Sequence, residues 1–472
     1  MADMSELVWK PAHELAALIR KRKIKPSELM AATLERIEAL NPKLNAFCMI
    51  REDRAMDEAL AMDKAIARRK NVGPLAGLPL GVKDLEDTEG LPTTYGSKPF
   101  QHHMPPGDSV QVARLKAAGA IVVGKTNAPE FGATAYTKNL IFGVTRNPWN
   151  PERTPGGSSG GSSAAIASAM VPLATGSDGG GSIRIPACYT GCYGFKGTFG
   201  RVPVEASLGM QQWNDTSVHG ALTRTVRDTA MFMDIAAGYH PVDPTSLPHP
   251  GFSYEACLKK LPKKLRIAFH PDFGQIVQSD VAREVAKAVA VFKDLGHKVT
   301  VISDPIPDTG GVWMRVGATQ ALASLYEWIE PHREAFGRSF ISGVVAAERI
   351  TWPAYGRAYR RRQEFSDWCR HVFEKFDLLL TPTLPTEAFA AKGPPPNQIN
   401  GKPLKNPLGA VVFTYPFNLS GHPAASVRAG FTDSGMPCGL QIVAERYRDD
   451  LVMQASYAYE QARPWNNKWP EI

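Results

Sequence analysis

Cysteine is scarce in this chain of 472 residues: there are six, and none has the spacing of a metal-ligand set. Cys188 and Cys192 lie four positions apart without a second such pair or a histidine pair, which argues against a zinc site. Scattered cysteines in a large chain are typical of a reducing compartment. We therefore expect free thiols, a cytoplasmic location, and neither a metal nor a cofactor. The six are Cys48, Cys188, Cys192, Cys257, Cys369 and Cys438.

Long apolar runs are missing as well. No stretch approaches the roughly 20 apolar residues of a membrane-spanning helix, and the N-terminus has no apolar signal core. The net charge of +8 raises the question of a polyanionic partner. The basic runs at residues 21–25 and 360–362 have no interleaved aromatic residues, and no nucleic-acid motif accompanies them. We expect neither a nucleic acid nor a membrane as partner.

Apolar patterns predict alternating helices and strands. A helical stripe from Leu29 to Leu40 should stop at Asn41–Pro42, and a second helix should begin at Asp108 and stop at Gly119. Buried strands are expected within residues 75–84, 120–123 and 378–380, and a further strand at 298–302 after a helix over 280–296. This alternation predicts an α/β fold, an α/β/α sandwich around a large mixed or parallel sheet.

Glycine and serine concentrate in residues 154–184, TPGGSSGGSSAAIASAMVPLATGSDGGGSIR. A helix of small residues should separate two loops, the second of which runs through three glycines into Ser182. Such loops serve anion binding, close packing, or a nucleophile whose neighbouring N–H groups stabilise an oxyanion. Neither phosphate-binding motif matches, and composition does not choose between the last two functions. The first loop holds Ser158, Ser159, Ser162 and Ser163.

A serine nucleophile needs a base, and the eleven histidines have no recognisable triad signature. Lys83 is the alternative, since it follows the apolar run LPLGV directly. A lysine buried at the end of a strand loses hydration, which lowers its pKa and favours the neutral amine. The same position suits a structural lysine paired with Asp84, and the residues alone leave both interpretations open.

Longer motifs resemble those of the amidase signature family over nearly the whole chain. The resemblance implies a single domain over residues 1–472, with a helical part at about 1–65, a catalytic core at about 66–230, and a remainder that completes the sheet and the substrate pocket. The members that it resembles are stand-alone amidases, arylamidases, nylon cyclic-dimer hydrolases and urethanases. The motifs are GVKD, GKTNAPEFG, TRNPWNPERTPGGSSGGSSAA, GSDGGGSIRIPA, GFKGTFGRVP, PFNLSGHPAASV and MPCGLQIVAER.

The resemblance implies a Ser–cis-Ser–Lys triad. Lys83 would be the base, Ser158 the bridging serine after a cis peptide with Gly157, and Ser182, 24 residues later, the nucleophile. The implied reaction is hydrolysis of an amide-like bond, in an amide, aryl amide, carbamate or ester, through an acyl-enzyme. The family's oxyanion hole corresponds to the backbone of Gly179, Gly180, Gly181 and Ser182, and its supporting residues to Ser159, Asp178 and Arg184.

Four positions depart from the family's pattern, and none removes a catalytic group. Gly179, Thr190, Gly197 and Arg428 stand where isoleucine or alanine, cysteine, proline and proline are common. Residues near the motifs, most of them aromatic or apolar, are candidates for a bulky apolar substrate pocket, although core packing would explain each aromatic residue equally well. They are Phe131, Tyr136, Ile141, Met210, Gln211, Gln212, Trp213, Phe413, Tyr415 and Phe417.

Two other functions stay open. The chain could be the A-type subunit of a glutamyl-tRNA amidotransferase, which needs partner subunits and fits the basic charge. It could also be a binding protein that keeps the fold without catalysis. For the stand-alone hydrolase we expect a small-molecule amide, carbamate or ester as the partner, and we allow for a homodimer.

Overall fold

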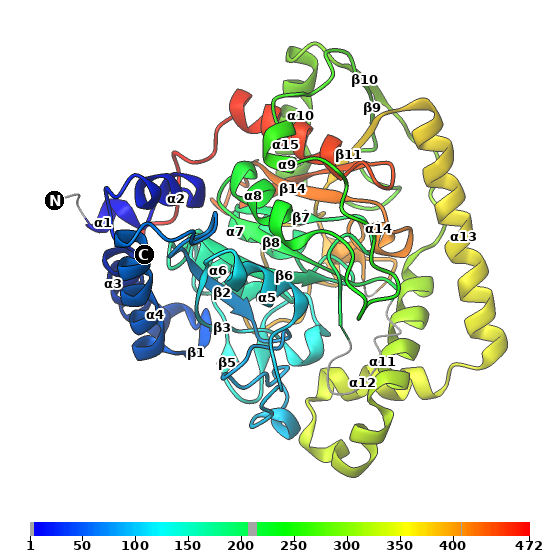
Figure 1. Ribbon diagram of the computed structural model, residues 1–472. Coiled ribbons are helices and arrows are strands. Elements are labelled where there is room, and N and C mark those ends of the chain that lie inside the picture. The colour runs from blue at the N-terminus through cyan, green and yellow to red at the C-terminus, as the bar shows by residue number, and fades with distance from the viewer. Residues whose placement is uncertain (1–3, 206–214, 407) are drawn as a thin grey trace.

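A twisted mixed sheet of eleven strands runs through the centre of the molecule (Figure 1). The computed structural model of the protein describes residues 4–205, 215–406 and 408–472. The sheet has the order β1-β3-β2-β6-β8-β7-β14-β15-β11-β9-β10. These strands are β1 Phe47–Ile50, β2 Pro79–Lys83, β3 Ile121–Thr126, β6 Leu173–Asp178, β7 Tyr193–Lys196, β8 Val218–Thr223, β9 Arg266–Phe269, β10 Lys298–Val301, β11 Leu378–Pro382, β14 Ala424–Phe431 and β15 Pro437–Ala444. The predicted mixed α/β sheet is confirmed.

Helices cover both faces of this sheet. Neighbouring residues of a strand point to opposite faces, and in β3 Val122 joins one apolar cluster while Ile121 and Val123 join another. The first cluster includes residues of α2, α5, α8, α10 and α15, and the second those of α3, α4 and α6. The bounds are α2 Ala12–Arg20, α3 Pro26–Leu44, α4 Glu52–Ala67, α5 Val110–Ala117, α6 Gly160–Ala167, α8 Val226–Ala236, α10 Ser279–Asp294 and α15 Asp449–Ala462.

Three long helices stand at one side of the molecule, at the right-hand edge of Figure 1. They are α11 Gly310–His332, α12 Arg338–Glu348 and α13 Trp352–Lys375, and α11 packs mainly on α12, α13 and α14. The shorter elements are α1 Met4–Leu7, α7 Arg184–Thr190, α9 Tyr254–Cys257, α14 Pro416–Leu419 and the ribbons β4 Lys138–Asn139 with β5 Gly143–Val144 and β12 Gln398–Ile399 with β13 Lys402–Pro403. None of the helices in the described ranges is both long and apolar enough to cross a membrane.

The predicted boundaries of three helices were wrong in detail. Helix α3 continues through Pro42 to Leu44, although proline has no N–H to donate to the preceding turn, and it ends at Asn45 in the left-handed region. Ser109, rather than Asp108, caps α5, since its Oγ accepts a hydrogen bond from the N–H of Val112. Ser162 and Ser163 lie within α6 and not on the loop before it.

Arg428, one of the departures from the family's pattern, ties the C-terminal segment to the sheet. Its guanidinium is buried on β14 and donates hydrogen bonds to the carbonyl oxygens of Gly191, Trp465 and Lys468, at 3.0, 3.1 and 2.7 Å. It also lies 4.6 Å from the centre of the Trp469 ring. A proline at this position could make none of these contacts, so the departure has a structural reason.

Candidate active site

Lys83 is the last residue of β2, between the parallel neighbours β3 and β6, and its side chain is fully buried. Its Nζ lies 2.8 Å from Ser158 Oγ and 2.9 Å from Ser177 Oγ. Burial lowers the pKa of Lys83 to about 7, although the charges of Glu86 and Asp178 oppose the shift. At neutral pH much of this amine is therefore uncharged and able to accept a proton.

The alternative interpretation, a structural pair of Lys83 with Asp84, is wrong. Asp84 Oδ1 faces a different buried lysine, Lys125, at 3.9 Å, and its carboxylate accepts hydrogen bonds from the N–H and the hydroxyl of Thr94. Within the described ranges, no carboxylate oxygen lies within 4.0 Å of Lys83 Nζ. The sheet separates the two side chains because adjacent residues at the end of a strand point to opposite faces.

Ser158 is buried and follows a cis peptide bond with Gly157. Gly132 leaves the space for its hydroxyl, since a Cβ at position 132 would lie 3.0 Å from Ser158 Oγ. The next residue, Ser159, donates its N–H to the carbonyl oxygen of Ser182 at 3.1 Å and its hydroxyl to that of Ser177 at 3.3 Å. These hydrogen bonds hold the two glycine-serine loops side by side, and Lys83 contacts Ser158 of the first loop and Ser177 just before the second.

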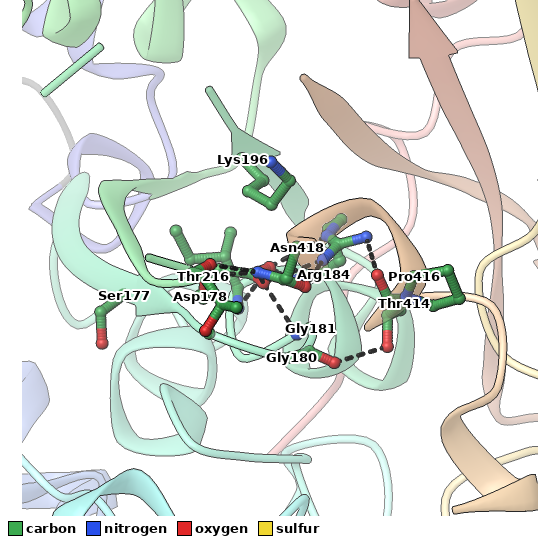
Figure 2. Close-up of polar contacts among 12 residues, drawn as sticks. Ser177, Asp178, Gly180, Gly181, Arg184, Lys196, Thr216, Thr414, Pro416 and Asn418 are labelled. Carbon is green, nitrogen blue, oxygen red and sulfur yellow. Dashed lines mark hydrogen bonds and ion pairs between the residues drawn. The ribbon is translucent and has the colours of Figure 1, made fainter. Parts of the chain in front are cut away.

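The carbonyl oxygens of residues 178–181, at the end of β6 and in the loop of residues 179–182 before α7, are all anchored in the protein. Asn418 donates to the carbonyl of Asp178, Trp313 Nε1 to that of Gly179, Thr414 to that of Gly180, and the N–H of Ile185 to that of Gly181. Figure 2 shows the contacts of Asn418 and Thr414. These four hydrogen bonds are 2.7, 2.8, 2.8 and 2.6 Å long.

The N–H groups of the same loop are mostly unpaired. The N–H of Gly181 donates to Asp178 Oδ1 at 2.7 Å, which sets it apart from its neighbours. Of the residues that the structure describes, none accepts a hydrogen bond from the N–H of Gly179, Gly180 or Ser182, and none contacts Ser182 Oγ in this way. Ser182 is also half-buried between fully buried neighbours. The loop therefore offers a hydroxyl and three N–H donors to a bound molecule.

A buried ion pair braces this loop from behind (Figure 2). Arg184 contacts both carboxylate oxygens of Asp178, Nη2 at 2.9 Å and Nε at 3.0 Å. Burial alone would raise the pKa of Asp178, but the Arg184 guanidinium outweighs it and holds that pKa well below its usual range. Arg184 also donates to Asn418 Oδ1, which links the pair to a segment more than 200 residues away.

Replacing Arg184 with Met should destabilise the fold by about 3–5 kcal/mol at pH 7, because Asp178 loses the cation that compensates its buried charge. In the natural protein the lowered pKa of Asp178 stabilises the fold above the unfolded value of about 3.9, and this contribution is lost as the pH falls. In the variant the pKa should be raised instead, so that stability falls as the pH rises. Urea unfolding across pH 5–8 measures both effects. A loss under about 1 kcal/mol would contradict the predicted role of the pair.

The candidate pocket residues lie in different surroundings. Phe131 is half-buried, stacks on Tyr95 with ring centres 5.6 Å apart, and precedes Gly132, which abuts Ser158. Tyr136 is half-buried beside Phe389, and Ile141 is half-buried in the turn between β4 and β5. Tyr415, Phe413 and Phe417 are buried in an apolar cluster, so for these three core packing is the observed role. Met210, Gln211, Gln212 and Trp213 lie outside the described residues.

Four residues that make polar contacts in the site were not predicted from the sequence. They come from Ser177, Trp313, Thr414 and Asn418. Ser177 could have been found, because strand alternation places it on the same face of β6 as Thr175, whose hydroxyl accepts from the N–H of Lys83. The other three reach the loop from distant parts of the chain and have no local signal.

Comparison with known proteins gives consistent matches over this architecture. The family model described as Amidase matches residues 28–453. An acylamidase of Rhodococcus erythropolis is 36% identical, with 98% of each chain covered. The A subunit of a glutamyl-tRNA(Gln) amidotransferase from Nostoc punctiforme is also 36% identical, with 97% of this chain and 99% of that one covered. The crystal structure of a bacterial aryl acylamidase superposes with a TM-score of 0.92, at 33% identity and 97% coverage of each chain.

These matches, together with the mixed sheet and its helical layers, define the protein as an enzyme that acts on carbon–nitrogen bonds of the amide type. The chain belongs to the amidase signature family, as its motifs predicted. It is similar to acylamidases and to amidotransferase A subunits at the same level of sequence identity.

Proposed function

We propose that this protein hydrolyses an amide-like bond of a small molecule, with Ser182 as nucleophile, Ser158 as relay and Lys83 as base. One observation carries the proposal: within the described residues the Ser182 hydroxyl and the N–H groups of Gly179, Gly180 and Ser182 have no partner. They lie next to Ser158, whose Oγ is 2.8 Å from Nζ of the buried Lys83. A hydroxyl nucleophile, a proton acceptor and oxyanion donors are the parts that acyl transfer requires.

In the first half-reaction the neutral Lys83 amine accepts the Ser158 proton, and Ser158 takes the proton of Ser182 as its Oγ bonds to the carbonyl carbon. The carbonyl oxygen gains the negative charge and lies against the N–H groups of Gly179, Gly180 and Ser182. Such a donor contributes about 3 kcal/mol in comparable sites. Gly181 takes no part, because its N–H is already bound to Asp178.

The C–N bond breaks in the second step. Ser158 donates a proton to the leaving nitrogen, since an amide anion is too basic to leave unprotonated, and recovers one from Lys83. The amine departs and the acyl group stays on Ser182 as an ester. A water molecule then attacks that ester and loses a proton to the Ser158–Lys83 pair. As the ester C–O bond breaks, the pair returns this proton to Ser182 Oγ, so that the acid and the free Ser182 hydroxyl are released.

Apolar aromatic side chains beside the relay serine favour an aryl or otherwise apolar substrate. Phe131, the residue before the glycine that abuts Ser158, belongs to a cluster with Tyr95, Phe100, Phe336 and Phe340. The similarity to an acylamidase and an aryl acylamidase points the same way. We therefore propose aryl amides as the first substrate class, and aryl carbamates and esters as further ones, for a single-domain enzyme of a reducing, cytoplasmic compartment.

A panel on one scaffold tests this function: 4-nitroacetanilide, 4-nitrophenyl acetate and methyl N-(4-nitrophenyl)carbamate, each with the purified single chain. We expect release of 4-nitroaniline from the anilide, and its rate relative to the ester and the carbamate measures the bond preference. The absorbance of the aryl product gives the rates directly. Absence of turnover of all three substrates would contradict the proposal.

The second candidate function is the amidotransferase A subunit, which the equal identity to such subunits favours. That function needs partner subunits and a glutamyl-tRNA acceptor. Hydrolysis of the anilide by the single chain, unchanged by added glutamyl-tRNA, would exclude a strict need for partners. Activity that appeared only with amidotransferase partner subunits would favour the second candidate.

A further inference from the structure

Trp313 of helix α11 is in direct contact with the loop that precedes Ser182. Its indole Nε1 donates a hydrogen bond to the carbonyl oxygen of Gly179 at 2.8 Å. Its ring also covers the next residue, because a Cβ on Gly180 would lie 2.5 Å from the indole Cζ2. A side chain at position 180 would therefore force the half-buried indole to move, so the glycine and the ring are matched in shape.

The hydrogen bond of Trp313 determines where the N–H of Gly180 points. A trans peptide is planar, so its N–H and C=O lie on opposite sides. The carbonyl of Gly179 and the N–H of Gly180 belong to the same peptide unit. Fixing the carbonyl on Trp313 turns this N–H, which has no acceptor among the described residues, to the opposite side of the peptide.

The anchors of the neighbouring peptides come from different places. Asn418 and Thr414 belong to the segment around α14, and the N–H of Ile185 is local to the loop. Trp313 lies on α11, which packs mainly on other helices rather than on the sheet. The orientation of the Gly180 peptide therefore depends on the helices at the edge of the molecule.

We propose that Trp313 is a positioning residue that directs the N–H of Gly180 at the oxyanion formed during acylation of Ser182. The inference rests on the proposed serine hydrolase function and adds the residue that orients one donor. Loss of the indole N–H should let the Gly180 peptide rotate, so that stabilisation of the tetrahedral state falls while binding of the substrate changes little.

The test is the rate at which a fluorophosphonate probe labels Ser182. In this reaction the Ser182 Oγ–P bond forms, the P–F bond breaks, fluoride leaves, and the serine proton passes to Ser158; the phosphoryl oxygen takes the place of the oxyanion. The first variant is Trp313→Phe. In the second, β-(3-benzothienyl)alanine replaces Trp313, which keeps the ring shape without the N–H. Both should label about 10- to 100-fold more slowly, because misdirecting a donor costs part of the 10²- to 10³-fold loss that follows its removal.

Trp465→Phe is the matched control. The indole of Trp465 also donates to a backbone carbonyl, that of Arg224 at 2.9 Å, but far from the loop in sequence and among core residues. We expect this variant to lose a similar amount of thermal stability and to label at the natural rate. The pH profile of labelling should stay unchanged in all variants, because none contacts Lys83. With an active anilide substrate, kcat should fall and KM should stay within about threefold.

The outcomes distinguish the positioning role of Trp313 from the proposed serine hydrolase function. If the natural protein is not labelled at Ser182, as mass spectrometry would establish, the proposed function fails. If it is labelled and the Trp313 variants react as fast as Trp465→Phe, the positioning role is overturned while the function stands. Slow labelling with a thermal midpoint and a pH profile like those of the control supports the inference.

Discussion

Ser182→Ala should abolish hydrolysis of the anilide, with kcat lowered on the order of 10⁶-fold, as in other hydrolases that lose their serine nucleophile. The Ser182 hydroxyl makes no hydrogen bond within the described structure and is half-buried, so its removal leaves no buried polar partner unpaired. We therefore expect the thermal midpoint of unfolding to stay unchanged. Initial rates and a thermal melt on the same preparation measure both.

Ser168→Ala is the control for this variant. Its hydroxyl is buried and, among the described residues, bonds only to backbone carbonyls of α6, so the change should affect stability slightly and activity not at all. A protein that keeps the fold without catalysis predicts instead that Ser182→Ala changes nothing measurable. Full activity of Ser182→Ala would make that interpretation the better one, or place the nucleophile elsewhere.

Lys83→Met should lower the rate of amide hydrolysis at pH 7 by about 10³- to 10⁴-fold, at the upper end of the range for a lost general base. Methionine keeps the length and the apolar contacts of the lysine stem but cannot accept a proton. The ester should suffer less than the anilide, because an alkoxide or phenoxide leaves without the proton that Lys83 returns through Ser158. Full activity of Lys83→Met on the anilide would show that the proposed base is wrong.

The pH dependence gives this prediction a second readout. With the pKa of Lys83 lowered to about 7 by burial, kcat/KM of the natural enzyme should rise with pH through about 7 and then level off, because the neutral amine is the active form. Below that pH the rate should fall about tenfold per unit. A profile that is flat from pH 5 to 9 would contradict the assignment.

Stability should move in the opposite direction to activity in Lys83→Met. The folded pKa of Lys83 lies below the unfolded value of about 10.4, so between pH 7 and 10.4 the unfolded chain binds a proton that the folded chain lacks. The free energy of unfolding of the natural protein therefore rises with pH across this window. At neutral pH the buried lysine destabilises the folded state. The methionine variant should be at least as stable at pH 7 and lack this pH dependence, which urea unfolding measures.

Local patterns were enough to predict several strands of the sheet. Residues 378–380 and 298–302 are short β-branched or leucine runs bounded by polar and turn residues, and they correspond to β11 and β10. Helix ends were harder, because a cap depends on which of two neighbouring side chains reaches the backbone. Ser109 rather than Asp108 does so at α5, while Asp108 accepts a hydrogen bond from Lys116 instead.

The glycine-serine segment of residues 154–184 shows what the sequence reveals about the site and what only the folded structure reveals. Its composition identifies a loop that can bring backbone N–H groups close to a ligand, and the motif order assigns it to a family. Composition does not reveal that the N–H of Gly181 is bound to Asp178, while those of Gly179, Gly180 and Ser182 have no acceptor in the part of the chain that the structure describes. Peptide orientation is decided by what holds each carbonyl.

The sequence by itself determined the family, the mixed α/β sheet and the burial of Lys83, because long motifs and apolar periodicity are local properties of the chain. Only the tertiary structure decided that Lys83 faces Ser158 and Ser177 rather than Asp84, and that Trp313 anchors the peptide before Gly180. Trp313 is separated from that peptide by 134 positions. No short-range pattern records such a contact, since it arises from the packing of helices on a loop that the sheet holds in place.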